Sequence, residues 1–462
     1  MKYLVLSILT VIAGLTAVAQ NYNMEITLSD GTKQYIPADK VSEVRFVTDS
    51  ETPGQAFNIL TEEYIPDGVL RNAIKEQVAR GSETLTNVEA AAYTGELILT
   101  DNRVQKFTGI EYLTSLSSLV AEGVFAKSLD VSKLTNLQLL DINRSEVEIL
   151  DLGTPTKLLS LNIGGTKLTQ FDLSPLPVCL AQLNVDNLKY ESLDLGRFSN
   201  LIELSCTQNG LTSLNVAGLT KLNKIIFTTN DLKKVSFAGC SNLEVVAGTY
   251  NLELSEVDLT GCKKIKNFMF MYTALESFDA ASFASTIEEI NLGWTKVNSV
   301  NISNCTNLTY LALDNCGMTE EIDFSSCPKL DVLRVDGNEI PNIDLTMCPD
   351  IAEIQCSGNN SLKSLKLADR LTTLHQLNID NVPALETFEW GATEKLQYAN
   401  IYMTPLKRID ISKVNQDYRN LYLDYNDNLT EIKVWPGFDL ENPPTSVQKP
   451  ANAKFVYEFT AD

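Results

Sequence analysis

The sequence has 462 residues, of which 44% are hydrophobic, 21% charged and 8% aromatic, a composition typical of a folded protein with a large core. Its 37 Lys and Arg residues stand against 59 Asp and Glu, and the formal charge of −22 makes nucleic acid or an anionic membrane surface a poor partner. The chain has 1 histidine, His375, which excludes His-rich metal sites and relays that need two imidazoles.

An apolar segment near the start of the chain predicts a secretory signal over residues 1–19. It follows Lys2 and ends at Ala17, Val18 and Ala19, the small-x-small pattern of a signal-peptidase site. The segment is short for a membrane anchor, and polar residues follow it. We therefore expect cleavage after Ala19 and an exported chain that is secreted, periplasmic or associated with the cell surface, with no membrane insertion after cleavage.

The next segments predict a small β-hairpin module and a linker. Residues 24–28 alternate in polarity, Asp30 and Gly31 predict a turn, and residues 41–47 are expected to pair back with the first strand. These features place the module at 20–48 and the linker at 49–56.

Residues 57–95 predict a helical N-terminal cap. Apolar residues recur at helical spacing from Val69 to Val78, behind the start signal formed by Pro66 and Asp67. A capping-box pattern at Thr86 and Glu89 then predicts a short second helix over 88–93. The open end of a repeat array exposes core residues, so a cap is expected at this position.

A repeat of about 21 to 22 residues organises residues 96–435. One copy of its pattern, Leu-x-x-Leu-x-Leu-x-x-Asn, contains Leu201, Leu204, Cys206 and Asn209. The fourth residue of the pattern recurs sixteen times, at Leu97, Leu119, Leu140, Leu161, Leu183, Leu204, Ile225, Val246, Phe268, Ile290, Leu311, Leu333, Ile354, Leu377, Ala399 and Leu421. One repeat cannot bury its own apolar face, so neighbouring repeats must stack. The remaining residues, 436–462, predict a C-terminal cap with a final strand within 453–459.

This pattern resembles the leucine-rich-repeat family, and in particular the short-repeat secreted bacterial class that includes internalins. The resemblance implies an α/β solenoid, a right-handed horseshoe with a parallel concave β-sheet and a helical N-terminal cap. In the family, residues such as Asn209, Asn230 and Asn251 form a ladder that bonds the turn backbone of adjacent repeats. The return segments lack a sustained helical period, so we expect an extended or 3₁₀ convex wall.

The nine cysteines follow the repeat, which argues against a simple disulfide framework. Five of them share a repeat position that holds Leu or Phe in other copies, and we therefore expect buried thiols. They are Cys240, Cys262, Cys305, Cys327 and Cys348. Adjacent members lie about one repeat apart, within the reach of a disulfide, so a bridge is the alternative.

The candidate ligand-binding residues lie on the expected concave face. Tyr250, Tyr272 and Trp294 occupy one column in three consecutive repeats, which predicts an aromatic strip with a spacing of about 4.8 Å, and Met269 and Met271 lie beside it. Aromatic side chains beside Asn and Asp suit a sugar face or a protein interface. The alternative is that these rings pack on one another and only stabilise the sheet.

A secondary candidate is the C-terminal cluster, Tyr402, Tyr422 and Tyr425. The acids of this region, including Asp314 and Asp336, share a column but form no calcium-loop spacing, and no pair of acids stands apart as a catalytic pair. Arg334 is expected to form surface ion pairs with them. We therefore expect no catalytic residue, metal or cofactor.

The sequence thus favours an exported, non-enzymatic binding protein that recognises a protein or glycan partner through the concave face of the solenoid. The alternative is a structural or assembly component of the bacterial cell envelope. A glycan hydrolase is the least favoured reading, because it needs two acids held together in a cleft.

Overall fold

The computed structural model describes residues 23–27, 33–37 and 56–460, and the chain divides into two compact units, Met1–Phe57 and Asn58–Asp462. In the first unit, β1 (Asn23–Thr27) and β2 (Lys33–Pro37) pair antiparallel, with Asn23 opposite Pro37 and Thr27 opposite Lys33. Residues 41–47, which we expected to pair with the first strand, lie outside the described residues, as do the signal segment and most of the linker.

The second unit begins with two helices whose starts are set by capping side chains. α1 (Gly68–Gln77) starts at Asp67, whose carboxylate accepts hydrogen bonds from the backbone N–H groups of Val69 and Leu70. α2 (Asn87–Ala92) starts at a capping box in which Thr86 and Glu89 each accept the other's backbone N–H. These bonds satisfy amides that have no partner within the helix, which is why the local sequence located both helices.

Two side chains at the ends of α1, Asp67 and Gln77, also form hydrogen bonds with the backbone of the first repeat. Gln77 donates Nε2 to the carbonyl of Ile98 at 2.6 Å and accepts the N–H of Ile98 at 2.9 Å, so its amide pairs with the strand edge as a neighbouring backbone would. The second oxygen of Asp67 accepts the N–H groups of Gln105 and Lys106. Burial raises the pKa of Asp67, but four backbone hydrogen bonds outweigh it and leave the pKa below its ordinary value.

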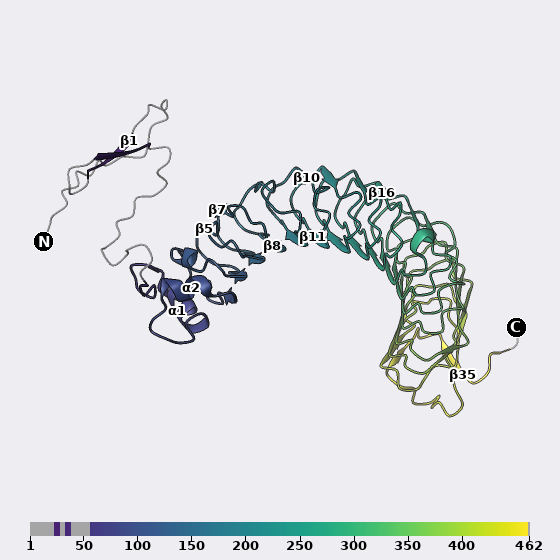
Figure 1. Cartoon of the computed structure of the whole chain (residues 1–462). Coiled ribbons are helices and arrows are strands. Elements are labelled where there is room, and N and C mark those ends of the chain that lie inside the picture. Colours follow the sequence, from purple (N-terminus) through teal and green to yellow (C-terminus); the bar gives the residue numbers. More distant parts are fainter. Residues whose placement is uncertain (1–22, 28–32, 38–55, 461–462) are drawn as a thin grey trace, which may run out of the picture. The chain divides into compact units, whose positions relative to one another are not determined.

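One parallel, in-register sheet runs through all sixteen predicted repeats and lines the inner side of the arc in Figure 1. The predicted inward residues face one another along it, from Leu97 opposite Leu119 to Ala399 opposite Leu421. Its strands are β3 (Glu96–Ile98), β4 (Ser118–Val120), β6 (Leu139–Asp141), β8 (Ser160–Asn162), β9 (Gln182–Asn184), β11 (Glu203–Ser205), β13 (Lys224–Ile226), β15 (Val245–Ala247), β17 (Asn267–Met269), β19 (Glu289–Asn291), β21 (Tyr310–Ala312), β22 (Val332–Arg334), β24 (Glu353–Gln355), β27 (Gln376–Asn378), β30 (Tyr398–Asn400), β32 (Asn420–Tyr422) and β34 (Val447–Gln448).

The opposite wall is built from short strands in several small parallel sheets, which confirms the extended return segments (Figure 1). These strands are β5 (Ser128–Asp130) with β7 (Ile149–Asp151); β10 (Ser192–Asp194), β12 (Ser213–Asn215), β14 (Lys234–Ser236) and β16 (Glu256–Asp258); β18 (Ser277–Asp279) with β20 (Ser299–Asn301); β23 (Asn342–Leu345), β25 (Ser364–Leu367) and β28 (Thr387–Glu389); β26 (Arg370–Leu371) with β29 (Ala392–Thr393); and β31 (Arg408–Asp410), β33 (Glu431–Lys433) and β35 (Lys454–Val456). In the described part of the chain, two 3₁₀ turns, η2 (Ile110–Tyr112) and η3 (Ala281–Phe283), interrupt the extended backbone.

The core lies between the two walls and adapts locally to large side chains. Phe227 and Phe270 are fully buried, and their rings meet edge-to-face with centroids 5.9 Å apart. Between them in the inward column lies Gly248, where an added Cβ would stand 2.5 Å from the Phe227 ring. A glycine is therefore required at this position by the packing of its two neighbours.

The predicted asparagine ladder closes the turns that follow the concave strands. Asn230 donates Nδ2 to the carbonyls of Cys206 and Phe227, and its Oδ1 accepts the N–H groups of Asn209 and Leu211. Asn251, Asn338, Asn359 and Asn426 repeat this pattern of bonds to their own and the preceding repeat. The ladder thus satisfies buried backbone groups that no strand pairing reaches.

The C-terminal end of the solenoid is covered by its own last segment. β34 extends the concave sheet beyond β32, and β35, within the predicted final strand, pairs with β33 on the opposite wall. The Tyr457 hydroxyl donates to the carbonyl of Phe438, whose ring packs against Phe455 with centroids 4.8 Å apart. Among the described residues, no helix is long and apolar enough to cross a membrane.

Candidate functional site

Each concave strand from β4 to β32 leads into a turn residue with a positive φ, directly before the ladder position. We call these residues the αL column. They are Gly123, Arg144, Gly165, Asn187, Gln208, Thr229, Tyr250, Tyr272, Trp294, Asn315, Gly337, Gly358, Asn381, Met403 and Tyr425. The N–H of a column residue bonds a carbonyl of the next repeat, as in Tyr250 to Met271 at 3.0 Å. This conformation favours Gly and Asn, and costs other residues about 1–2 kcal/mol.

The aromatic strip, Tyr250, Tyr272 and Trp294, occupies three consecutive places in this column. The Tyr250 and Tyr272 rings lie 4.6 Å apart at 5° to each other, and the Tyr272 and Trp294 rings lie 5.7 Å apart at 12°. Tyr250 is 48% exposed and Trp294 is 51% exposed, whereas the central Tyr272 is half-buried between them. The structure therefore brings these three predicted residues together as one stack.

The geometry of the stack decides which parts of the rings a ligand can contact. Both faces of Tyr272 lie against neighbouring rings, so the strip presents mainly ring edges and the outer faces of its two end members. On the Trp294 side, the next column residue is Asn315. Its Oδ1 would lie 2.3 Å from a Cβ added to Gly337, so its side chain leans toward Gly337 and away from Trp294. The Asn315 side chain therefore does not cover the outer indole face, in agreement with the exposure of Trp294.

Met269 and Met271 belong to the repeat of Tyr272, as predicted. Met269 ends β17, where it is opposite Ala247 on one side and Asn291 on the other. Both methionines are half-buried, and the Met271 carbonyl accepts the N–H of Tyr250. They add adaptable apolar surface beside the strip.

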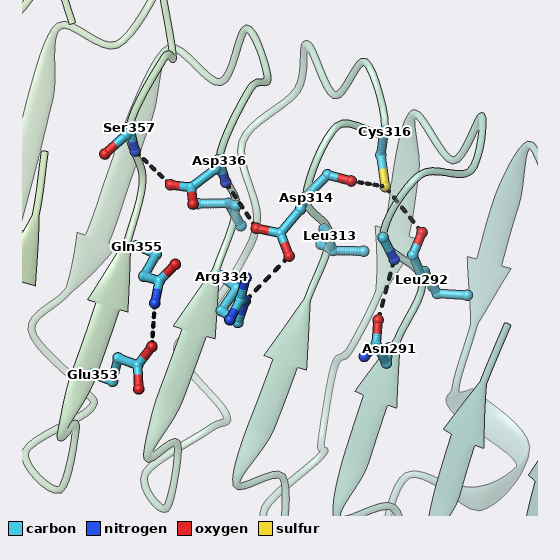
Figure 2. Close-up of polar contacts among 12 residues, drawn as sticks. Asn291, Leu292, Leu313, Asp314, Cys316, Arg334, Asp336, Glu353, Gln355 and Ser357 are labelled. Carbon is cyan, nitrogen blue, oxygen red and sulfur yellow. Dashed lines mark hydrogen bonds and ion pairs between the residues drawn. The ribbon is translucent and has the colours of Figure 1, made fainter. Parts of the chain in front are cut away.

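A polar network that the sequence did not resolve follows the strip along the same sheet (Figure 2). The Asp314 carboxylate accepts Nε of Arg334 at 3.2 Å through one oxygen and the N–H of Asp336 at 3.3 Å through the other. Asp336 in turn accepts the N–H of Ser357 at 2.7 Å. The expected ion pair is therefore made by Asp314, while Asp336 serves the backbone of the next repeat.

The Asp314 and Asp336 carboxylates accept backbone N–H groups that, in some other repeats, are accepted by an Asn or Asp of the same repeat. Asp141 and Asn162 each accept the N–H of the residue two positions later. Arg334 and Gln355 hold the corresponding position in their repeats, and the N–H groups two positions after them belong to Asp336 and Ser357. The preceding repeat supplies the acceptor there instead. Asp314 and Asp336 thus have a structural role in addition to their charge.

Asp336 is held in a setting that disfavours its charged form. Burial is the main cause, and the neighbouring carboxylates of Asp314 and Asp380 add to it, against the lowering effects of the Ser357 N–H and of Arg334. Together they raise the pKa of Asp336 to about 6. Asp314, Asp336 and Asp380 thus bring three carboxyl groups close together on the concave side, beside the guanidinium of Arg334.

The secondary candidates form a looser group. The rings of Tyr402 and Tyr425 meet edge-to-face with centroids 6.4 Å apart, and Tyr425 is 77% exposed. Tyr422 lies half-buried in β32. The charge of Asp380, together with burial and a hydrogen bond to the same carboxylate, raises the pKa of Tyr402. This cluster lacks the parallel stack of the strip.

The cysteines are free thiols, as the repeat position predicted, and no disulfide links them within the described residues. Cys240 and Cys262 donate to the carbonyls of Val216 and Phe237, each at 3.3 Å. Burial is the main cause that raises the pKa of the Cys305 thiol to about 11 and those of Cys262, Cys327 and Cys348 to about 12. Such thiols are poor nucleophiles, so this row belongs to the core.

Comparison with known proteins places this geometry in a structural family. A family model described as the leucine-rich-repeat domain of the endo-β-N-acetylglucosaminidase EndoS matches residues 65–244. The functional domain of InlJ from Listeria monocytogenes, described as including a cysteine ladder, has a TM-score of 0.64 at 22% identity, covering 82% of this chain and 77% of that chain. A search of curated proteins found no match.

Two further solved structures are similar at lower scores. The internalin inlF from Listeria monocytogenes has a TM-score of 0.43 at 18% identity, covering 75% of this chain and 99% of that chain. YopM from Yersinia enterocolitica has a TM-score of 0.49 at 16% identity, covering 84% of this chain and 94% of that chain. The registered repeats and the similarity to the InlJ domain show that this chain has an internalin-like leucine-rich-repeat solenoid fold, and its residues 65–244 match a leucine-rich-repeat family model.

Proposed function

We propose that this chain is an exported, non-enzymatic recognition protein that binds a protein or glycan partner through the concave face of its solenoid, with the aromatic strip at the centre of the site. The observation that carries the proposal is the stack of Tyr250, Tyr272 and Trp294 in the αL column, with its two end rings about half exposed. Solenoids of this kind provide extended concave surfaces for binding.

The energetics favour a functional strip over a purely structural one. Two stacked pairs contribute about 0.5–1.5 kcal/mol each beyond burial. Three aromatic residues with positive φ cost about 1–2 kcal/mol each relative to Gly. Ring stacking by itself therefore does not exceed the backbone cost of these three positions, and strained residues of this kind are typical of binding sites.

The glycine beside the strip, Gly293, also supports a binding role for the strip. Gly293 directly precedes Trp294 of the αL column. A Cβ added to Gly293 would lie 3.6 Å or more from the nearest atoms, so packing does not require a glycine there. Gly164 holds the same position in an N-terminal repeat, but a Cβ there would stand 2.4 Å from Oδ1 of Asn184. The missing side chain at Gly293 instead leaves the surface beside Trp294 open to a ligand.

The test is a binding screen against arrays of glycans and extracellular-matrix proteins. The strip variant is Tyr250→Asn/Tyr272→Asn/Trp294→Asn, because Asn tolerates positive φ and keeps the turn. The matched control, Met403→Asn/Tyr425→Asn, changes exposed residues of the same column near the C-terminal end. Thermal melts check that both variants fold.

We expect the wild type and the control to bind the same ligand class and the strip variant to bind at least about tenfold more weakly. Equal binding by the strip variant would place the site elsewhere, and loss in the control alone would move it to the C-terminal cluster. If the wild type binds nothing on either array, a role as an assembly component of the cell envelope becomes the better reading.

A further inference from the structure

If the proposed function holds, the charge around the aromatic strip indicates the chemical class of its ligand. On the concave strands from β15 to β27, and on the two residues that follow each of them, the charged residues are five acids and one base, of which Glu289 is exposed and the others are half-buried. They are Glu289, Asp314, Asp336, Glu353 and Asp380, against Arg334. Arg334 is already paired with Asp314, so the surface next to the strip has a net negative charge.

An aromatic face opens directly onto this acidic surface. The outer face of Trp294 is turned toward the repeat of Asp314, because Tyr272 covers its other face. Asn315 leans away toward Gly337, and Gly293 contributes no side chain. An open indole face beside carboxylates attracts a cation both through the ring quadrupole and through the surrounding charge.

The stack itself makes a sugar chain a poorer occupant. Successive sugar rings would each need an exposed aromatic face, but the faces between Tyr250, Tyr272 and Trp294 are taken up by one another. The strip carries two phenol hydroxyls and an indole N–H, which suit the carbonyl groups of a peptide backbone.

We propose that the ligand of the aromatic strip is a basic segment of a protein, in which an Arg or Lys side chain stacks on the outer face of Trp294 and the carboxylates from Glu289 to Asp380 attract its positive charge. The pKa of Asp336 is raised mainly by burial and also by the carboxylates of Asp314 and Asp380, and the contribution of these carboxylates agrees with a site for a cation. A bound cation would relieve the repulsion among them.

The experiment is a selection from a phage-displayed library of random 12-residue peptides on the protein expressed from its complete sequence. The strip variant serves for counter-selection. A charge variant, Glu289→Gln/Asp336→Asn/Glu353→Gln, keeps the strip and can keep the hydrogen bonds that these side chains accept from Asn267, Ser357 and Gln355. Affinities of selected peptides are then measured at low and high salt, and melts confirm folding.

We expect the selected peptides to carry Arg or Lys, to bind the charge variant and the Trp294→Asn variant at least about tenfold more weakly, and to lose affinity as salt is added. Replacing the Arg of a selected peptide by citrulline should weaken it similarly. Neutral or acidic peptides that still need the strip would overturn this inference while leaving the proposed function intact. If no selected peptide prefers the wild type to the strip variant, and glycans bind on the array, this inference is also overturned and the proposed function stands. Equal binding of every ligand by the strip variant would overturn both.

Discussion

Gly165 and Trp294 occupy the same position of the repeat and nearly the same backbone conformation, with φ of 69° and 61°. In the N-terminal repeats three of the first four residues of this column, Gly123, Gly165 and Asn187, suit the turn, and the other is Arg144. In the central repeats it holds three aromatic rings in a stack. The fold places the same backbone demand on both regions, so the turn geometry alone does not account for the stacked rings of the central repeats.

The glycines before this column give the largest expected contrast. Gly164→Ala places a Cβ 2.4 Å from Oδ1 of Asn184, which also accepts the N–H of Asp186, so that side chain cannot move without losing its bond. We expect a loss of about 2–3 kcal/mol in unfolding free energy. Gly293→Ala has ordinary contacts and should change stability by less than about 0.5 kcal/mol. Denaturant melts of the two variants measure both values, and equal losses would refute the contrast.

Exchanging residues within the αL column should have a smaller effect. Gly165→Trp adds a side chain at positive φ without a stacking partner, and we expect it to cost about 1–2 kcal/mol. Trp294→Gly loses one stacked pair but removes the same backbone cost, so its stability should stay within about 1 kcal/mol of the wild type. A large loss in Trp294→Gly would show that the strip is mainly structural.

The pH dependence of Asp336 offers a third test. Its folded-state pKa is raised from 3.8 to about 6, so the folded protein binds the proton more tightly than the unfolded chain does. Stability from this group therefore falls as pH rises from about 4 to about 6. Asp336→Asn should raise the melting temperature at pH 7 by a few degrees at most and have little effect at pH 4.

Asp67 in the N-terminal cap should show the opposite pH dependence of stability in the same assay. Its pKa is lowered, so its contribution is present above the ordinary pKa of the carboxyl and is lost as pH falls through the folded-state pKa. Asp67→Asn should therefore be most destabilising near neutral pH. Parallel pH profiles for Asp67→Asn and Asp336→Asn would contradict these assignments.

The smallest effect concerns thiol chemistry and not stability. Cys179 is half-buried, whereas the other eight described cysteines, Cys240 and Cys316 among them, are buried. A disulfide-exchange reagent should therefore modify about one thiol quickly in the native protein and all nine after denaturation without reductant. A deficit after denaturation would show that some of these thiols form disulfides.

The repeat made most of the fold predictable. Each inward residue, from Leu97 to Leu421, lies at a strand centre in register with its neighbours, because only that alignment buries the apolar column. The helix starts followed from Asp67 and Thr86, whose side chains act within a few residues of the chain. Signals of this local kind can be read without coordinates.

Contacts between repeats were harder to predict. The sequence placed Tyr250, Tyr272 and Trp294 in one column, but it did not show their positive φ or which ring faces the stack covers. It also missed the backbone bonds of Asp314 and Asp336, because they depend on which side chain lies two residues earlier in the next repeat. Gln77, which pairs with Ile98 across 21 residues, gave no local signal at all.

The exposure of Trp294 makes the candidate site optically observable. The chain has 3 tryptophans. Trp390 is buried, Trp435 packs against Tyr418 and Phe438, and Trp294 is half exposed in the strip. Emission at the long-wavelength edge of the spectrum, and its quenching by iodide or acrylamide, should therefore come mainly from Trp294. A ligand that covers this ring would shift the emission and protect it from the quencher, so binding can be followed on the native protein without an attached dye.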